Sequence, residues 1–171
     1  MGKNINEKEI LKIFSQRLSE VINENENSNA GFAKKIGVSS SIVSLYLAGK
    51  RNPKGTMLYN IAKTCHVSAD WLLGLSDNKK IGTLKESTMP LSLEFAIRFS
   101  RLLTERNMTK FEFTKQYEIM SNQKNAKELA LTCARGKSGL SLRTLLITSQ
   151  IFNVSIDYLL GIKEEKKIVT N

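Results

Sequence analysis

Apolar residues recur at helical spacing, three or four positions apart, through the first 75 residues of the chain. The longest apolar stripe runs over 10–22 and predicts a helix of about four turns. Shorter apolar groups within 32–36, 42–47, 58–65 and 71–73 predict four more helices. No segment alternates between apolar and polar residues as a half-buried strand does, so the pattern predicts an all-α fold.

Serine and glycine residues mark the ends of the predicted helices. Ser28 and Asn29 are both good N-cap residues for the second helix, and Gly37 suits the left-handed position that ends it. One of the serines at 39–41 then caps the third helix, which is expected over 39–48 before a second glycine. The predicted order is therefore helix, tight turn, helix.

The chain contains an internal repeat. VSADWLLGL at 67–75 and VSIDYLLGI at 154–162 share six of nine residues at an offset of 87. Nearer the N-terminus, residues 14–36 lie over 95–117 at an offset of 81. The two offsets imply a six-residue insertion in the second copy, between residues 118 and 135. The repeat predicts two tandem five-helix domains, the second divergent.

A polar segment between the copies predicts the domain boundaries. It includes Gly82 and ends at Pro90, which restricts its predecessor away from helix and suits the first turn of the next one. The sequence thus predicts a domain at 1–75, a linker at 76–91 and a domain at 92–171. The charged tail after the second copy is expected to fray.

Composition and charge narrow the class of protein. The 171 residues are 41% hydrophobic and 25% charged, which is typical of a folded globular chain. Lys and Arg outnumber Asp and Glu by 26 to 16, a formal net charge of +10, so nucleic acid is the expected polyanionic partner. No apolar run approaches the roughly 20 residues of a membrane span, which predicts a cytoplasmic protein without membrane attachment.

Residue types that carry catalysis or bind metal are sparse. Cys65 and Cys133 stand alone rather than in a C-x-x-C pair, and His66 is the single histidine. No enzyme motif is present, so no catalytic residue, cofactor or metal site is expected. Asn153 replaces His66 in the second copy, and both residue types favour a left-handed helix end.

The predicted helix-turn-helix lies in a basic part of the chain. The segment GFAKKIGVSSSIVSLYLAGKRNP, followed by LYNIAKTCHVSADWLLG, resembles the lambda-repressor-like, XRE-type helix-turn-helix family of DNA-binding transcription regulators. The resemblance covers about residues 10–75, and residues 92–163 resemble the same domain weakly. No acidic residue occurs between Glu26 and Asp70, whereas six cationic residues do: Lys34, Lys35, Lys50, Arg51, Lys54 and Lys63.

The resemblance implies which residues contact DNA. It places helix 39–48 in the major groove of double-stranded DNA, and its hydroxyl groups discriminate bases poorly. Readout through groove shape is therefore expected to outweigh paired base contacts. The expected base contacts are Ser40, Ser41, Ser44, Leu45 and Asn29. The expected phosphate contacts are Arg17, Lys35, Lys50, Arg51 and Asn52.

Two arginines at equivalent positions of the copies share one feature. Relatives commonly carry a Glu two residues before the glycine that ends the third helix, and this Glu can pair with the arginine of the first helix. The chain has Leu47 there, and Ala134 in the second copy. We therefore expect Arg17 and Arg98 to lack a carboxylate partner and to be freer to meet phosphate.

The leading functional hypothesis is a sequence-specific DNA-binding regulator. The resemblance favours a repressor, since compact relatives, including phage regulators, often block promoters. The second copy then dimerises, receives a signal from a regulatory protein or contacts DNA, and its insertion is expected to displace or lengthen the counterpart of the recognition helix. Two alternatives stay open: tandem copies acting as a pseudo-dimer, and a protein-binding module such as an antitoxin or a phage-encoded inhibitor.

Overall fold

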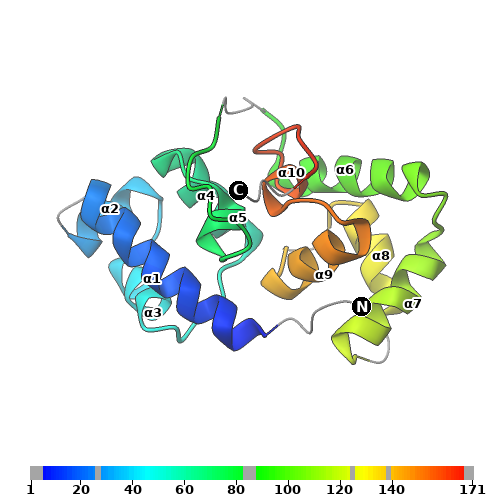
Figure 1. The fold of residues 1–171 in the computed structure, drawn as a ribbon, viewed down its shortest axis with the longest axis horizontal. Helices are drawn as coiled ribbons and strands as arrows, with labels where there is room; N and C mark the ends of the chain where they lie inside the picture. Colours follow the sequence, from blue (N-terminus) through cyan, green and yellow to red (C-terminus); the bar gives the residue numbers. More distant parts are fainter. Residues whose placement is uncertain (1–5, 26–27, 83–87, 124–125, 138–139, 168–171) are drawn as a thin grey trace. The chain divides into compact units, whose positions relative to one another are not determined.

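A computed structural model describes residues 6–25, 28–82, 88–123, 126–137 and 140–167. Within these ranges the chain forms ten helices, and its extended backbone pairing is limited to one isolated bridge between Val67 and Lys80. The chain divides into two compact units (Figure 1). We call their described parts the N-terminal unit, residues 6–82, and the C-terminal unit, residues 88–167. The predicted all-α class is confirmed for the described residues.

Five helices form the N-terminal unit. Their apolar stripes meet in one core, in which Phe14, Phe32 and Leu58 are completely buried. Because each stripe is amphipathic, burial of one face fixes how the helix is turned. The helices are α1 (Glu7–Asn25), α2 (Asn29–Lys35), α3 (Ser40–Leu47), α4 (Gly55–Cys65) and α5 (Ala69–Leu72).

Local hydrogen bonds explain where α2 ends and α3 begins. The Ser28 hydroxyl accepts from the Gly31 amide at 3.1 Å and caps α2. Gly37 has a φ of +74°, and the Val38 amide returns to the Ala33 carbonyl at 2.9 Å, so the helix closes with a left-handed residue. The predicted tight turn is confirmed, with α3 starting one residue inside its expected range.

Residues 76–82 pack on the N-terminal unit, although the sequence places them in a linker. The Lys79 ammonium lies 2.6 Å from Glu20 and 2.7 Å from Glu24, and 4.8 Å from the centre of the Trp71 ring. The Ser68 amide also donates to the Lys79 carbonyl at 2.8 Å. The middle of the predicted linker, residues 83–87, lies outside the described residues.

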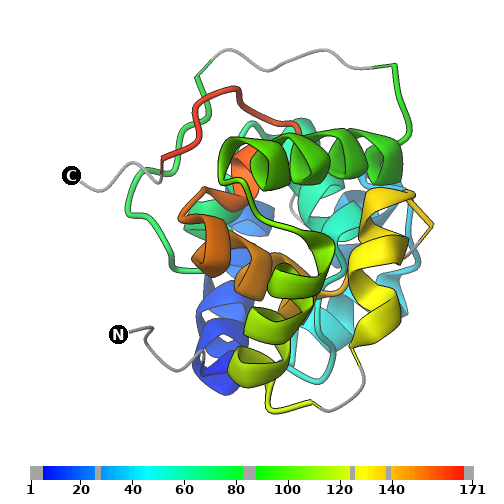
Figure 2. The same cartoon turned by 90° about the vertical axis from the view of Figure 1, so that its right-hand side faces the viewer.

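Five further helices form the C-terminal unit (Figure 2). Aromatic side chains dominate its core: the Phe99 ring lies 4.8 Å from Phe113 and 6.0 Å from both Phe95 and Phe152. Such edge-to-face and stacked pairs add to the stability that burial supplies. The helices are α6 (Leu91–Glu105), α7 (Lys110–Ser121), α8 (Lys127–Ala134), α9 (Leu142–Phe152) and α10 (Ile156–Leu159).

Helix bounds show where the C-terminal unit has more residues than the N-terminal unit. Helices α8, α9 and α10 begin and end 87 positions after α3, α4 and α5. Helix α7 begins 81 positions after α2 but has 12 residues where α2 has 7. Helix α8 keeps the eight residues of α3. The expected lengthening of α8 is therefore wrong, because the insertion extends the helix before the turn.

The left-handed helix ends are confirmed in both units. His66 ends α4 with a φ of +54°, and Asn153 ends α9 with a φ of +53°. These residue types tolerate the left-handed region better than most others, so the position selects for them. The single histidine is thus accounted for by backbone conformation.

The tail after Ile162 does not fray in its described part. The Ser155 amide donates to the Lys166 carbonyl at 2.6 Å, and the Lys166 ammonium lies 2.5 Å from Glu105 and 5.8 Å from the Tyr158 ring centre. These contacts repeat those of Lys79 at the offsets of the sequence repeat. Residues 168–171 lie outside the described residues.

Candidate nucleic-acid interface

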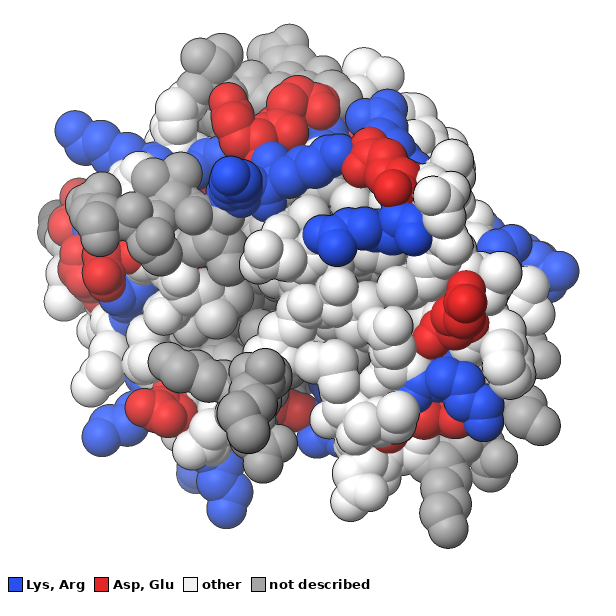
Figure 3. Space-filling view, turned by 45° about the vertical axis from the view of Figure 1, so that its right-hand side comes forward, with Lys and Arg blue, Asp and Glu red and all other residues white. Residues whose placement is uncertain are grey.

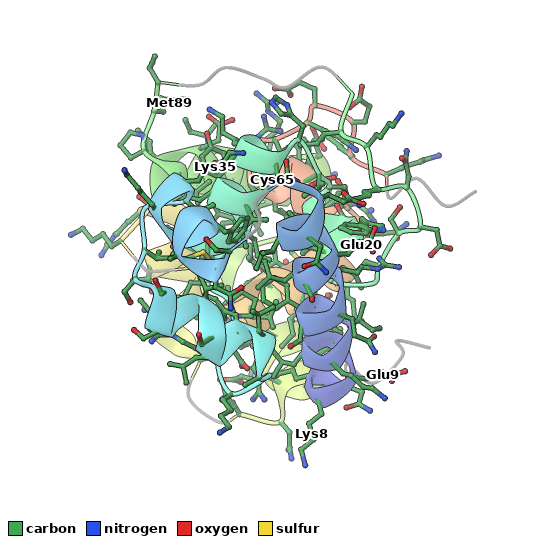
Figure 4. All side chains as sticks on the ribbon, turned by 90° about the vertical axis from the view of Figure 1, so that its left-hand side faces the viewer. Lys8, Glu9, Glu20, Lys35, Cys65 and Met89 are labelled. Carbon is green, nitrogen blue, oxygen red and sulfur yellow. The ribbon has the colours of Figure 1, made fainter. Side chains whose placement is uncertain are left out.

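One face of α3 packs against α1, and the opposite face is exposed. The Tyr46 ring meets Phe14 edge-on with centres 5.8 Å apart, and the Ser15 hydroxyl donates to the Tyr46 carbonyl at 2.8 Å. Val43 is completely buried on the same side. Figure 4 shows α2 and α3 together on one side of α1. A rigid helix is thus presented outward, as groove binding requires.

The exposed face of α3 carries the four side chains that the resemblance assigns to base contact. Ser40, Ser41 and Ser44 are exposed, and Leu45 is 38% exposed. The Ser44 hydroxyl donates to the Ser40 carbonyl at 3.0 Å, so toward a base it retains only acceptor capacity. Asn29 is exposed at the first position of α2.

Cationic and polar side chains follow α3 directly. Lys50, Arg51 and Asn52 are all exposed. The Lys50 amide donates to the Leu45 carbonyl at 2.9 Å, which fixes the start of this loop. Burial raises the pKa of Tyr46, and the charge and hydrogen bond of Arg51 offset part of that rise. Lys50, Arg51 and Asn52 thus form an exposed polar segment directly after α3.

Acidic side chains are separated from these elements. Helices α2 and α3 and the loop to α4 contain none. Glu20 and Glu24 pair with Lys79, and Figure 4 shows Glu20 on the side of α1 away from α2 and α3. Lys35, in the last turn of α2, is exposed. The surface around the turn thus has a positive potential that a phosphate backbone would meet without repulsion.

Arg17 does not extend this surface as expected. Its guanidinium donates to the Trp71 carbonyl and, at 2.9 Å, to the Ser76 carbonyl. It also lies 4.9 Å from the centre of the Trp71 ring and 3.5 Å from the Asp77 carboxylate. The expectation that Arg17 lacks a carboxylate is therefore wrong. Asp77 supplies it from the segment after α5, which no local spacing reveals.

The equivalent expectation for Arg98 is also wrong. Its side chain is 3% exposed, lies 2.9 Å from Glu94 and 2.8 Å from Glu164, and donates to the Lys163 carbonyl at 3.1 Å. Its guanidinium lies 4.6 Å from the centre of the Tyr158 ring. A buried charge of this kind needs its partners, so Arg98 is structural rather than a phosphate contact.

Two lysines were not singled out from the sequence. Lys79 joins the segment after α5 to α1, and Lys166 joins the segment after α10 to α6. Lys79 and Lys166 stand 87 positions apart, and their partners Glu24 and Glu105 stand 81 apart. Both pairs therefore obey the offsets of the internal repeat. Extending the comparison past residue 75 would have revealed them.

Comparison with known proteins agrees with this geometry. Residues 18–72 match the model of a helix-turn-helix family, a range that contains all of α2 to α5 and ends with the last residue of α5. The match supports a helix-turn-helix domain in the N-terminal unit and points to a DNA-binding transcription regulator. Searches of curated proteins and of solved structures returned no match.

Two other kinds of site are absent from the described residues. In the ranges that the structure describes, no three His, Cys, Asp or Glu side chains lie together as a metal site would need. No helix in those ranges is long and apolar enough to cross a membrane.

Proposed function

We propose that the N-terminal unit binds double-stranded DNA sequence-specifically and that the chain is a transcription regulator of the repressor type. The observation that carries this proposal is the exposed, acid-free face of α2 and α3, bordered by cations and backed by a rigid core. In the proposed complex α3 enters the major groove, and α2 braces against the backbone.

The side chains divide into two groups by chemistry. Leu45 meets a thymine methyl group, and the Ser44 oxygen accepts from an exocyclic amine of adenine or cytosine. Because these contacts are few, groove shape supplies much of the preference. The backbone contacts are Lys35, Lys50, Arg51 and Asn52. Arg17 is left out because the protein itself occupies its guanidinium.

We also infer that the C-terminal unit is a divergent copy of the N-terminal one. Three helices of the C-terminal unit follow their counterparts in the N-terminal unit at an offset of 87 residues. In addition, each unit places one arginine and one lysine against the ring of an equivalent aromatic residue, Trp71 or Tyr158. If the chain dimerises, the dimer would set two recognition helices about 34 Å apart on a palindromic operator.

Salt dependence of DNA binding tests the proposal. The full chain is titrated against a fluorescent mixed-sequence duplex of about 30 base pairs over a range of salt concentrations, and the affinity is plotted as log K against log salt. The three cations Lys35, Lys50 and Arg51 of one N-terminal unit predict a slope near −2.7. Lys50→Ala should make the slope less negative by about 0.9. Lys80→Ala, the matched control, removes an exposed cation of the same unit and should not change it.

Sequence preference is measured separately, by selection of bound fragments from genomic DNA. Leu45→Ala and Ser44→Ala should alter the selected sequences while the salt slope stays unchanged. The proposal fails if the chain ignores duplexes even at low salt. It also fails if Lys50→Ala and Lys80→Ala reduce affinity equally.

A further inference from the structure

The two helices of the C-terminal unit that take the places of α2 and α3 are α7 and α8. They follow at the repeat offsets, and α7 packs against α8 as α2 packs against α3. Phe32 and its counterpart Phe113 are both completely buried, so the two helix pairs share their inner face. Their outer faces can therefore be compared position by position.

The outer face of α7 and α8 is apolar where that of α2 and α3 is polar or small. Phe111 stands where the first unit has Ala30, and Leu131 stands where it has Ser44. Phe111 is 69% exposed, although a benzyl side chain gains by burial. A single exposed apolar side chain is ordinary on a folded surface, whereas an apolar area that continues into a pocket marks a binding site.

A pocket opens between the two helices. It has a volume of about 340 Å³, and its lining is mostly apolar. That volume lies at the lower end of ligand pockets, enough for one bulky apolar side chain rather than an extended ligand. The residues that line it include Phe111, Thr114, Lys115, Glu118, Ala130 and Leu131.

Positive charge borders this pocket. Lys110 also lines it, and the Lys115 ammonium lies 5.5 Å from the centre of the Phe111 ring. Among the described residues neither lysine forms an ion pair. The acids of α7 are engaged locally: Glu112 accepts from the Thr109 amide at 2.7 Å, and Glu118 accepts from the Ala126 amide at 3.0 Å. Both carboxylates keep their charge, but they accept from backbone amides and form no ion pair with Lys110 or Lys115.

We propose that this pocket binds an acidic, amphipathic segment of a partner protein. One bulky apolar side chain of the segment fills the pocket, and flanking carboxylates pair with Lys110 and Lys115. Duplex DNA presents no comparable apolar group to fill it. A second copy is disfavoured by charge, because residues 81–171 carry 14 Lys and Arg against nine Asp and Glu.

Charge on the visible surface is mixed. Figure 3 shows one face of the molecule, on which Lys and Arg side chains lie among Asp and Glu side chains rather than in one continuous basic patch.

A labelled synthetic peptide tests the proposal with the full chain. The probe is a helix-forming peptide of about 16 residues with leucines at i, i+3, i+4 and i+7 and glutamates on the flanks. Two control peptides replace all glutamates by glutamine or all leucines by serine. Anisotropy should show binding of the probe and at least about tenfold weaker binding of either control.

Variants place the binding on the pocket. Phe111→Ala and Lys115→Glu should each weaken probe binding at least about tenfold. Their matched controls are Ile119→Ala, which removes an 80% exposed apolar side chain of α7 outside the lining, and Lys167→Glu, which makes the same charge reversal elsewhere in the unit. Both controls should change affinity less than about twofold.

Amide chemical shifts separate the remaining outcomes. Shifts confined to α7 and α8 support the proposal, and they do so whether or not the N-terminal unit binds DNA. Shifts on α2 and α3 that duplex DNA competes away mean that the peptide is only a polyanion, which overturns it. Equal binding of the serine control overturns it as well. A dimer in sedimentation that Phe111→Ala dissociates would show a second copy in the pocket and likewise overturn it.

Discussion

Replacing Arg17 with alanine separates a structural role from DNA contact. The guanidinium joins α1 to the end of α5 and to the segment after it through the Trp71 and Ser76 carbonyls. It also faces the Trp71 ring at 4.9 Å. If this description is correct, the loss should appear as reduced stability of the N-terminal unit and not as reduced attraction for phosphate.

The magnitude follows from the contacts. A hydrogen bond with a charged donor contributes about 1.5 kcal/mol at the lower end of its range, which applies because the Arg17 side chain is still 21% exposed. The cation–π contact adds about 0.5–1 kcal/mol. The ion pair adds little, because the Asp77 side chain is 90% exposed. The two hydrogen bonds and the cation–π contact together give an expected destabilisation by Arg17→Ala of about 3.5–4 kcal/mol.

Urea unfolding followed by tryptophan fluorescence measures this loss. Trp71 is the only tryptophan, so its signal reports the N-terminal unit rather than the whole chain. Arg17→Lys keeps the charge but loses the planar fork and should lose about half as much stability. Asp77→Ala should cost less than about 1 kcal/mol.

DNA binding by the same variants completes the test. Under conditions in which Arg17→Ala remains folded, its log–log salt slope should equal that of the wild type, whereas Lys50→Ala shifts it by about 0.9. The reasoning is refuted if Arg17→Ala unfolds like the wild type but lowers the salt dependence by that amount. Arg17 would then be a phosphate contact.

Three further changes have defined outcomes. Gly37→Ala should destabilise the N-terminal unit by about 1–2 kcal/mol in urea, because the φ of +74° is strained for a side chain although no atom lies within 4 Å of the added Cβ; Gly37→Asn should cost less, and equal loss would contradict the cause. Burial lowers the pKa of Lys79, but Glu20 and Glu24 together raise it above 10.5. The extra stability of the wild type over Lys79→Met should therefore be fully present below pH 10.5 and should disappear as the pH rises through the higher folded-state pKa. A stability difference that grows over this pH range would contradict the proposed role of the two glutamates. Hydrogen bonds from the Thr109 amide and hydroxyl lower the pKa of Glu112 below 4.5. The extra stability of the wild type over Glu112→Gln should therefore be present above pH 4.5 and lost as the pH falls through the lower folded-state pKa. A stability difference that does not change with pH in acid unfolding would argue against these hydrogen bonds as its cause.

Positions with strong local preferences could be predicted from the sequence. Gly37 turns α2 into α3, and His66 and Asn153 end α4 and α9, because the left-handed conformation is accessible to few residue types. The exposed serines of α3 followed from helical periodicity, since the buried face of a helix determines the other.

Only part of the surroundings of the candidate site residues could be predicted from the sequence. Asn29, Lys50 and Arg51 are exposed around the turn, as the resemblance implies. Arg17 was misjudged because its hydrogen-bond partner Ser76 lies 59 residues away along the chain. The number of residues between two such positions does not give their distance in the folded chain.

The order of residues was enough to predict the helices, the turn between α2 and α3, the repeat and the separation of positive from negative charge. These depend on neighbouring residues, whose backbone preferences and periodicity act over a few positions. Packing of the folded chain was needed to show that protein groups pair with Arg17 and Arg98, and that residues 76–82 and 163–167 pack against their own units. It alone revealed the pocket beside Phe111, because a pocket exists only where packed helices leave space between them.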